Sequence, residues 1–383
     1  MSKPCKIALI SPAHPLRGGI AALSERLALE LQHHGYEVTI VSFSLQYPPF
    51  LFPGKTQYSS DPAPEGLRIE PWINSINPIN WVRTGLRLRR LNPDLIVVRY
   101  WLPFMAPSLG SILRIGRPKG TPVVAITDNV LPHEKRLGDE LLTRYFIASA
   151  DAFIAMSKSV ERDLRRFTTS KPVRVIPHPI YDNYGPLATR EESLRALNLS
   201  PAYRYVLFFG FIRDYKGLDL LLQAFADERL KQLPLRLLVA GEFYTDEKPY
   251  RELIEKLELW ERVVLHSEYI PSSKVRYYFG AADLVAQPYK SATQSGISQM
   301  AYHFEKPMVV THVGGLPEIV PHGRAGYVVS PEPAAIAAAI ADFFENDRLE
   351  TLTAGVREEK TRFSWHHLVE GLEALGAEVR GRQ

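Results

Sequence analysis

The chain has 383 residues, of which 45% are hydrophobic and 23% are charged, proportions typical of globular proteins and not of disordered or fibrous ones. This length exceeds what one hydrophobic core usually serves, so we expect two domains. The single cysteine, Cys5, excludes an internal disulfide and fits a reducing cytoplasm. The N-terminal apolar run is too short for a signal peptide, and no run of eighteen apolar residues predicts a membrane-spanning helix.

The net charge of +4 is unevenly distributed, because residues 1–185 carry +8 and residues 186–383 carry −4. A basic first half fits contact with an anionic partner, such as a phospholipid surface or a diphosphate-bearing acceptor, and it fits a role in solubility alone equally well. We expect a cytoplasmic protein whose contact with the inner face of the membrane, where present, is peripheral.

Strands and helices alternate along the first half. A strand is predicted at Ile7–Ile10, and the helical spacing of the apolar residues after it predicts a helix that ends before Gly35. Further strands are predicted at Val38–Phe43, Leu95–Val98, Val123–Ile126, Ala152–Ala155 and Val173–Ile176. This alternation indicates a parallel, doubly wound sheet.

Residues Ile79–Leu91 predict an amphipathic helix with three arginines, Arg83, Arg87 and Arg90, on one face. Such a helix can lie on an anionic membrane surface. It can also be a core-packed helix with a solvated face, and the sequence leaves both interpretations open.

Prolines punctuate the middle of the chain, and we place a domain junction between residues 185 and 186. The alternation then restarts, with strands predicted at Tyr205–Phe209, Leu235–Ala240, Val263–Leu265, Asp283–Gln287 and Met308–Thr311. The predicted fold class is therefore α/β, with two Rossmann-like, doubly wound domains. In open α/β sheets ligands bind beyond the carboxyl ends of the strands, so the loops after the strands are the candidate sites.

Three of these loops carry anion-binding signals. Gly18 and Gly19 open a helix after the first strand; by itself this pair fits a tight connection, and it also fits a turn whose backbone amides approach a phosphate. The loop Gly210–Gly217 brings Arg213 and Lys216 to a strand tip and a helix start, and this pair can neutralise a departing diphosphate. A third helix start lies at Ser295, a predicted N-cap, with Gln294 before it and Gly296 after it.

Together with Gln287-Pro288-Tyr289 and the segment Lys306–Glu318, these motifs resemble the retaining glycosyltransferases of the GT-B fold, family four. The resemblance covers nearly the whole chain and is most specific over Tyr205–Glu318. It implies an acceptor domain of residues 1–185, against which a final helix of residues 363–383 packs, and a donor domain of residues 186–362 facing it across a cleft.

The resemblance also implies an activity: transfer of a hexose-type sugar, with retention, from a nucleoside diphosphate to a hydroxyl of a lipid-linked or polysaccharide precursor. Arg213 and Lys216 would hold the donor diphosphate and the Gly18 and Gly19 amides would close on it, so no metal or other cofactor is expected. No nucleic-acid partner is expected.

The chain departs from the family pattern at two places. Family members usually place a histidine at the strand tip where this chain has Asp128, and His133 lies near enough in sequence to supply the imidazole. We assign Asp128 and His133 to orienting the reacting sugar hydroxyls. The family also carries two glutamates near 290–300, whereas no acidic residue occurs here between Asp283 and Glu305.

Gln294, Gln299 or Met300 occupies the region where the family has its two glutamates. We assign Gln294, Ser295 and Gly296 to donor binding. Two alternatives to transfer follow from the departures and the fold: a homologue that binds sugar nucleotides with weak or no catalysis, and a sugar-nucleotide hydrolase or epimerase.

Overall fold

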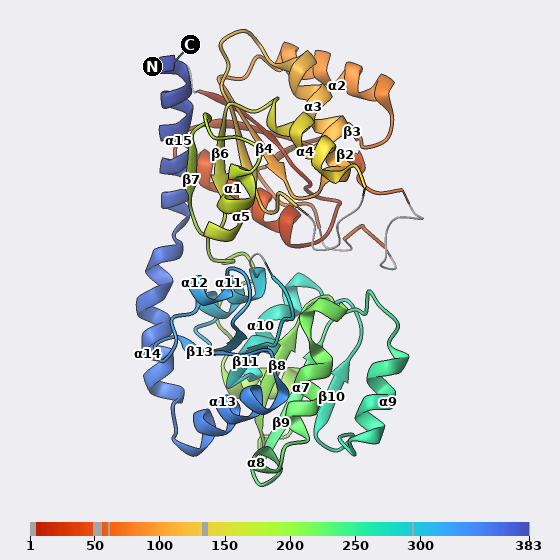
Figure 1. The fold of residues 1–383 in the computed structure, drawn as a ribbon, viewed down its shortest axis with the longest axis vertical. Helices are drawn as coiled ribbons and strands as arrows, with labels where there is room; N and C mark the ends of the chain where they lie inside the picture. Colours follow the sequence, from red (N-terminus) through yellow and green to blue (C-terminus); the bar gives the residue numbers. More distant parts are fainter. Residues whose placement is uncertain (1–4, 49–55, 60–61, 132–136, 293–294, 383) are drawn as a thin grey trace. The chain divides into compact units, whose positions relative to one another are not determined.

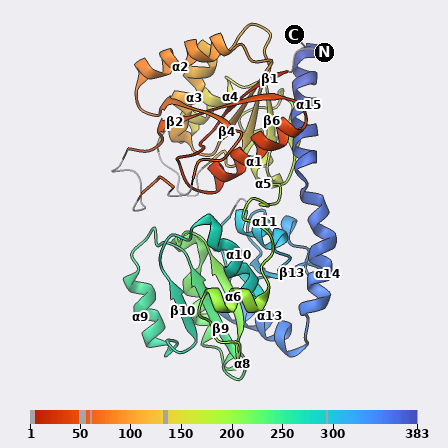
Figure 2. The same cartoon turned by 180° about the vertical axis from the view of Figure 1, so that it is seen from behind.

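The structure, a computed structural model, describes residues 5–48, 56–59, 62–131, 137–292 and 295–382. It divides into two compact units, which Figures 1 and 2 show from opposite sides. Unit 1 consists of Met1–Pro179 and Ser364–Gln383, and unit 2 consists of Ile180–Phe363. The chain therefore leaves unit 1 once and returns to it through its last helix.

Unit 1 contains a seven-stranded, all-parallel sheet in the order β3-β2-β1-β4-β5-β6-β7. The strands are β1 (Lys6–Ile10), β2 (Glu37–Leu45), β3 (Arg68–Asn74), β4 (Leu95–Tyr100), β5 (Val123–Thr127), β6 (Ala152–Ala155) and β7 (Val173–Val175). Every residue of β4, β5 and β6 is buried, as expected for parallel strands covered on both faces.

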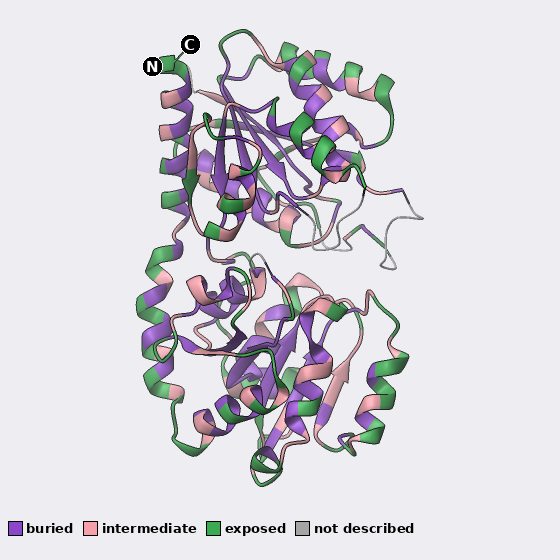
Figure 3. Ribbon diagram, in the orientation of Figure 1, coloured by how far each residue is buried: buried purple, intermediate pink, exposed green. Residues whose placement is uncertain are grey.

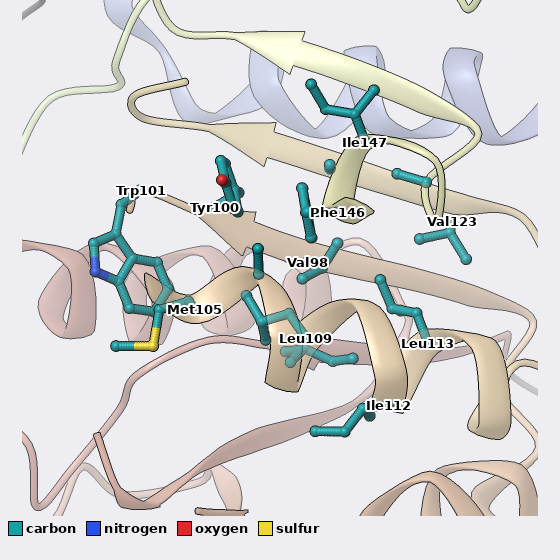
Figure 4. Close-up of a cluster of buried hydrophobic side chains, with 14 of the residues drawn as sticks. Val98, Tyr100, Trp101, Met105, Leu109, Ile112, Leu113, Val123, Phe146 and Ile147 are labelled. Carbon is teal, nitrogen blue, oxygen red and sulfur yellow. The ribbon is translucent and has the colours of Figure 1, made fainter. Parts of the chain in front are cut away.

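The helices of unit 1 connect these strands and cover the sheet (Figure 1). They are α1 (Gly19–His33), α2 (Pro78–Leu91), the 3₁₀ turn η2 (Pro103–Met105), α3 (Ala106–Gly116), α4 (Asp139–Ile147), α5 (Lys158–Arg165) and α15 (Trp365–Arg382). Figure 4 shows how side chains of α3, such as Leu109 and Leu113, pack on the β4 side chain Val98. Figure 3 shows that the sheets are buried, whereas the outer sides of the helices are exposed.

Strand β3 is the element of the first half that sequence patterning missed. Its residues alternate poorly and include Pro71, which cannot donate a ladder hydrogen bond. Pro71 is tolerated because β3 is an edge strand of the sheet. The last helix, α15, packs against β6, β5 and α1 within unit 1.

Unit 2 contains a six-stranded, all-parallel sheet in the order β10-β9-β8-β11-β12-β13. The strands are β8 (Arg204–Phe209), β9 (Leu235–Ala240), β10 (Val263–His266), β11 (Leu284–Gln287), β12 (Met308–Thr311) and β13 (Gly326–Val329). Sequence patterning missed β13, a four-residue edge strand that begins at a glycine.

The helices of unit 2 also cover their sheet, and Figure 2 shows α6 beside α10. They are α6 (Arg190–Ala196), the 3₁₀ turn η3 (Asp214–Lys216), α7 (Leu218–Phe225), α8 (Glu228–Lys231), α9 (Lys248–Lys256), α10 (Ser272–Ala281), α11 (Gly296–His303), α12 (Leu316–Ile319), α13 (Pro333–Glu345), α14 (Leu349–Lys360) and the 3₁₀ turn η4 (Thr361–Phe363).

In each sheet the strand order reverses at one place. The reversal lies between β1 and β4 in unit 1 and between β8 and β11 in unit 2. The loops that follow two such neighbouring strands leave in opposite directions and open a crevice at the carboxyl edge of the sheet. The predicted glycine pair follows β1, and the Arg213–Lys216 loop follows β8, so both lie at these reversal points.

No helix in the described ranges has the length and hydropathy needed to cross a bilayer.

Candidate functional site

In unit 2, the loop after β8 carries Lys216 at the reversal point of the sheet, where a ligand crevice is expected. Lys216 ends the turn η3 and its side chain is buried, with 9% exposed. Its ammonium lies above Gly210, because a Cβ built on that glycine would be 3.2 Å from Lys216 Nζ. Gly210 has a positive φ of 95°, so a glycine serves both the turn and the close approach of the ammonium.

Burial, and to a smaller extent the neighbouring Arg213 charge, together lower the pKa of Lys216 to about 7. The charged form of Lys216 is therefore destabilised in the protein without a ligand. A bound anion beside its Nζ would stabilise the charged form again and raise the pKa of Lys216.

Arg213 is exposed, and its guanidinium lies 5.1 Å from the centre of the Tyr244 ring. Within the described part of the chain, no carboxylate forms an ion pair with Arg213 or with Lys216. Two cations therefore lie close together at the reversal point without a carboxylate to neutralise them, which is the arrangement expected for a polyanion site.

The loop after β11 supplies the second side of this crevice. Ser295 is the N-cap of α11, as predicted, and its Oγ accepts a hydrogen bond from the Ile297 backbone N–H at 3.2 Å. Gly296 begins the helix under the Tyr181 ring, whose nearest carbon would lie 2.9 Å from a Cβ at that position. The first-turn amides of α11 carry the positive end of the helix dipole.

Tyr289 of the Gln287-Pro288-Tyr289 segment connects the two sides. Its hydroxyl lies 3.2 Å from Ser295 Oγ, and its ring centre lies 5.9 Å from Lys216 Nζ. The side chain of Ile297 also reaches Gly210. The structure therefore brings Lys216 and the start of α11 together within one unit.

Gln294 lies outside the described residues. Gln299, which shares its region of the sequence, is fully buried, and neither of its amide atoms has a hydrogen-bond partner among the described residues. Met300 is buried as well. Gln287 is also buried and accepts a hydrogen bond from Ser298, so amide groups occupy the interior beneath the start of α11.

In unit 1, the loop after β1 presents the predicted glycine pair at the start of α1. Gly18 has a φ of 115°, and a Cβ built on it would meet no described atom within 4 Å. No side chain caps α1. The first turn of α1 therefore lacks a side-chain cap, and its amides carry the positive end of the helix dipole, which favours an anion.

Side chains from neighbouring elements hold this loop in place. The His14 N–H donates to Glu25 Oε1 at 2.6 Å, and the Ala13 N–H donates to Ser42 Oγ at 2.9 Å. Ser11 Oγ lies 2.6 Å from Ser24 Oγ. Burial raises the pKa of Glu25, partly opposed by the hydrogen bond from His14. These polar residues were not identified from the sequence.

Asp128 follows β5 and is buried in a charged cluster. Its carboxylate accepts hydrogen bonds from Arg99 Nε at 3.0 Å and from Arg99 Nη2. His178 Nε2 lies 3.4 Å from Asp128 Oδ1. All three side chains are at most 7% exposed. His133, the second residue assigned to hydroxyl orientation, lies outside the described residues.

The pKa values within this cluster follow from burial and charge. Burial alone would raise the pKa of Asp128, but the Arg99 charge and the contact with His178 outweigh burial and hold that pKa below its ordinary value. Burial lowers the pKa of His178 more than Asp128 raises it. The cluster is therefore a carboxylate and a guanidinium beside a neutral imidazole at pH 7.

Arg99 and His178 were not identified from the sequence. A signal for Arg99 existed, since a charge within the apolar run Leu95–Tyr100 requires a buried partner. No comparable signal marked His178, which lies 50 positions after Asp128 in the chain.

Comparison with known proteins reveals similarity along most of the chain. Residues 189–359 match the family model described as glycosyl transferases group 1, and residues 17–183 match glycosyltransferase family 4. A D-inositol 3-phosphate glycosyltransferase from Corynebacterium urealyticum is 26% identical over 309 residues, which cover 76% of this chain and 72% of that relative.

Two solved structures have a similar fold. Sucrose-phosphate synthase from Thermosynechococcus elongatus superposes with a TM-score of 0.78 at 18% identity, over 99% of this chain and 100% of that one. Anabaena Alr3699/HepE in complex with UDP superposes with a TM-score of 0.72 at 17% identity, over 97% of this chain and 100% of that one. These likenesses extend over both units of the fold.

Proposed function

Because the chain belongs to the glycosyltransferases of group 1 and family 4, we propose that it transfers a hexose-type sugar, with retention, from a nucleoside diphosphate to a hydroxyl of a lipid-linked or polysaccharide precursor. The observation that carries this proposal is the pair of cations in the crevice of unit 2. Arg213 and Lys216 lie at the sheet reversal point beside the start of α11, where a diphosphate would meet three positive groups.

The chemical step needs stabilisation of the negative charge that grows on the leaving diphosphate. A preorganised guanidinium, an ammonium and helix amides supply that stabilisation at fixed positions. We propose that these groups take the place of a metal ion in the reaction. The complex of Alr3699/HepE with UDP supports a nucleoside diphosphate as the donor's leaving group.

Unit 1 would bind the acceptor. We propose that the Gly18 and Gly19 amides bind an anionic substrate group, and that Asp128 and His133 orient the reacting hydroxyls. The phosphate in the name of the inositol-phosphate relative supports an anionic acceptor, as does the +8 charge of residues 1–185.

The first experiment is a thermal-shift screen of the purified protein against nucleoside diphosphate sugars, since a ligand that binds the folded state raises the melting temperature. The best donor is then tested for sugar transfer to an acceptor panel. Lys216→Ala should reduce turnover by more than about tenfold, which equals about 1.4 kcal/mol of transition-state stabilisation. Unchanged turnover in that variant would refute the assigned role of Lys216.

Because no acidic residue occurs between Asp283 and Glu305, the same experiment also distinguishes sugar transfer from two alternative functions. Donor binding without turnover on any acceptor would favour a sugar-nucleotide-binding protein. Donor breakdown at the same rate with and without acceptor would favour a hydrolase or epimerase.

We also propose that the chain works at an anionic membrane surface, through helix α2. Its inward face carries Gly85, which lies so close to α3 that a Cβ there would be 2.8 Å from Ile115 Cβ. This contact fixes the rotation of the helix and leaves an apolar stripe exposed: Ile79 is 65% exposed, Val82 46% and Leu86 43%. An exposed apolar stripe is the face that such a helix inserts between lipids.

The arginines of α2 supply the charge that an anionic surface would attract. All four, Arg83, Arg87, Arg89 and Arg90, are exposed, and none forms an ion pair with a described carboxylate. The helix itself contains no acidic residue. The basic face and the apolar stripe are therefore both presented by one helix, which favours a lipid surface over simple solvation.

Sedimentation with vesicles tests this surface. The protein should bind phosphatidylcholine vesicles containing phosphatidylglycerol and not vesicles of phosphatidylcholine alone. Replacing Arg83, Arg87 and Arg90 by alanine should weaken binding about 100-fold, since each cation contributes about 1 kcal/mol at such a surface. The control replaces Arg165, the last residue of α5, and Arg166 directly after it, which pair with Glu161 and Glu140 respectively. Equal losses in both variants would contradict a specific role for α2.

A further inference from the structure

Lys290, a residue without a role so far, joins the two loops that flank the crevice of unit 2. Its backbone N–H donates to the Tyr215 carbonyl oxygen at 2.7 Å. Its Nζ lies 2.8 Å from Asp214 Oδ1 and 3.0 Å from Asp219 Oδ2. The residue follows β11, whereas all three partners belong to the segment between β8 and the first turn of α7, so Lys290 bridges the reversal point of the sheet.

The two loops are also in direct backbone contact. Gly217 has a φ of 69°, and a Cβ at this position would lie 1.9 Å from the Pro288 carbonyl oxygen. The loop that carries Lys216 therefore packs directly against the loop that carries Lys290.

The segment from the loop after β8 to the first turn of α7 contains charges of both signs within seven positions. Arg213 and Lys216 are cations, and Asp214 and Asp219 are carboxylates. Among the described residues, both carboxylates pair with Lys290 and neither pairs with Arg213 or Lys216. One lysine therefore pairs with both acids of this segment, and Arg213 and Lys216 form no ion pair with either of them.

Asp219 shows how much this pairing matters. Its Oδ1 is buried and has no hydrogen-bond partner among the described residues, while its Oδ2 contacts Lys290. A partly buried carboxylate that lost this partner would be strongly drawn to another cation. Arg213 and Lys216 are on the same loop, six and three positions away in sequence.

We propose that Lys290 is a positioning residue of the donor site, which holds Asp214 and Asp219 away from Arg213 and Lys216 so that both cations remain free for a diphosphate. Lys290 acts through these charges and does not itself touch the ligand. The inference rests on the proposed function, because it takes a nucleoside diphosphate as the ligand.

Binding of UDP, with GDP and ADP measured in parallel by calorimetry, tests the inference without depending on turnover. Lys290→Ala should raise the Kd of the tightest-binding nucleoside diphosphate by about tenfold, because the freed carboxylates then compete with the ligand for the cations. Lys290→Arg should restore most of the affinity. The control is Lys231→Ala, since Lys231 forms an ion pair with Glu228 elsewhere in unit 2.

A second variant separates electrostatics from a purely mechanical link between the loops. In the triple variant Lys290→Ala, Asp214→Asn, Asp219→Asn, the loop keeps its two cations and loses the competing carboxylates. Affinity should return to within about threefold of the unaltered protein if charge is the cause. Circular dichroism and melting temperature show whether each variant is folded.

The outcomes separate this inference from the proposed function. If the unaltered protein binds none of the three diphosphates, the proposed function fails and the inference fails with it. If the unaltered protein binds and Lys290→Ala binds equally well, only the inference fails. If Lys290→Ala binds weakly and the triple variant binds no better, Lys290 is a mechanical link and the electrostatic inference is wrong.

Discussion

The buried position of Lys216 predicts that donor binding takes up a proton. Its pKa is lowered from an ordinary 10.5 to about 7 by burial and by Arg213, a difference equivalent to about 5 kcal/mol between the two protonation states. A bound diphosphate would favour the ammonium and raise this pKa again. At pH 8 about nine tenths of the free protein then has a neutral Lys216, so binding should take up about 0.9 proton.

Calorimetry in two buffers of different ionisation enthalpy measures this uptake directly. A nucleotide sugar is the appropriate ligand, because it lacks the terminal phosphate that titrates near pH 6. Proton uptake should be small at pH 6 and approach one at pH 8, while Kd rises about tenfold between pH 8 and 9. Lys216→Arg should bind with little pH dependence, since a guanidinium stays charged. A Kd that does not change from pH 6 to 9 in the unaltered protein would refute the reasoning.

Three further predictions concern stability. Between pH 7 and 10.5 the Lys216 side chain is protonated in the unfolded chain and neutral in the folded one. The contribution of Lys216 to the free energy of unfolding should therefore rise with pH in that window, and this rise should be absent in Lys216→Met. Denaturant titrations of both proteins at pH 7 and pH 9 measure the difference. The lowered pKa of Asp128 contributes stability that is present above its unfolded pKa near 3.8 and lost as the pH falls through the folded value. Asp128→Ala should cost about 3–5 kcal/mol at pH 7 because it leaves the Arg99 charge buried and unpaired, and urea melts in which Asp128→Ala equals the unaltered protein would contradict the ion pair. Gly217→Ala should lower the melting temperature more than Gly323→Ala, since both positions have a positive φ but only the first places a Cβ against a carbonyl oxygen; equal losses would contradict the close approach of Gly217 to Pro288.

The local sequence pattern alone was sufficient to predict most of the buried strands and one helix cap of this protein. A run of apolar, β-branched residues is a strong sequence signal for a parallel strand, because parallel strands covered on both faces contain few polar residues. The strands β4, β5 and β6 were therefore predicted to within two residues of their observed ends. Ser295 was predicted as an N-cap because capping depends on residues one to three positions away. The edge strands β3 and β13 escaped prediction because an edge strand needs neither an apolar run nor every backbone donor.

Only the tertiary structure decided which charges meet. Arg99 lies in β4, whereas Asp128 follows β5 and His178 follows β7, so their contact depends on the order in which these strands lie in the sheet. The same holds for Lys290, which reaches Asp214 and Asp219 because β8 and β11 are neighbours in the sheet, although their starts, Arg204 and Leu284, are 80 residues apart. Burial and charge pairing are properties of such neighbourhoods, so a sequence can name the ionisable residues but cannot say which of them remain free to hold a ligand.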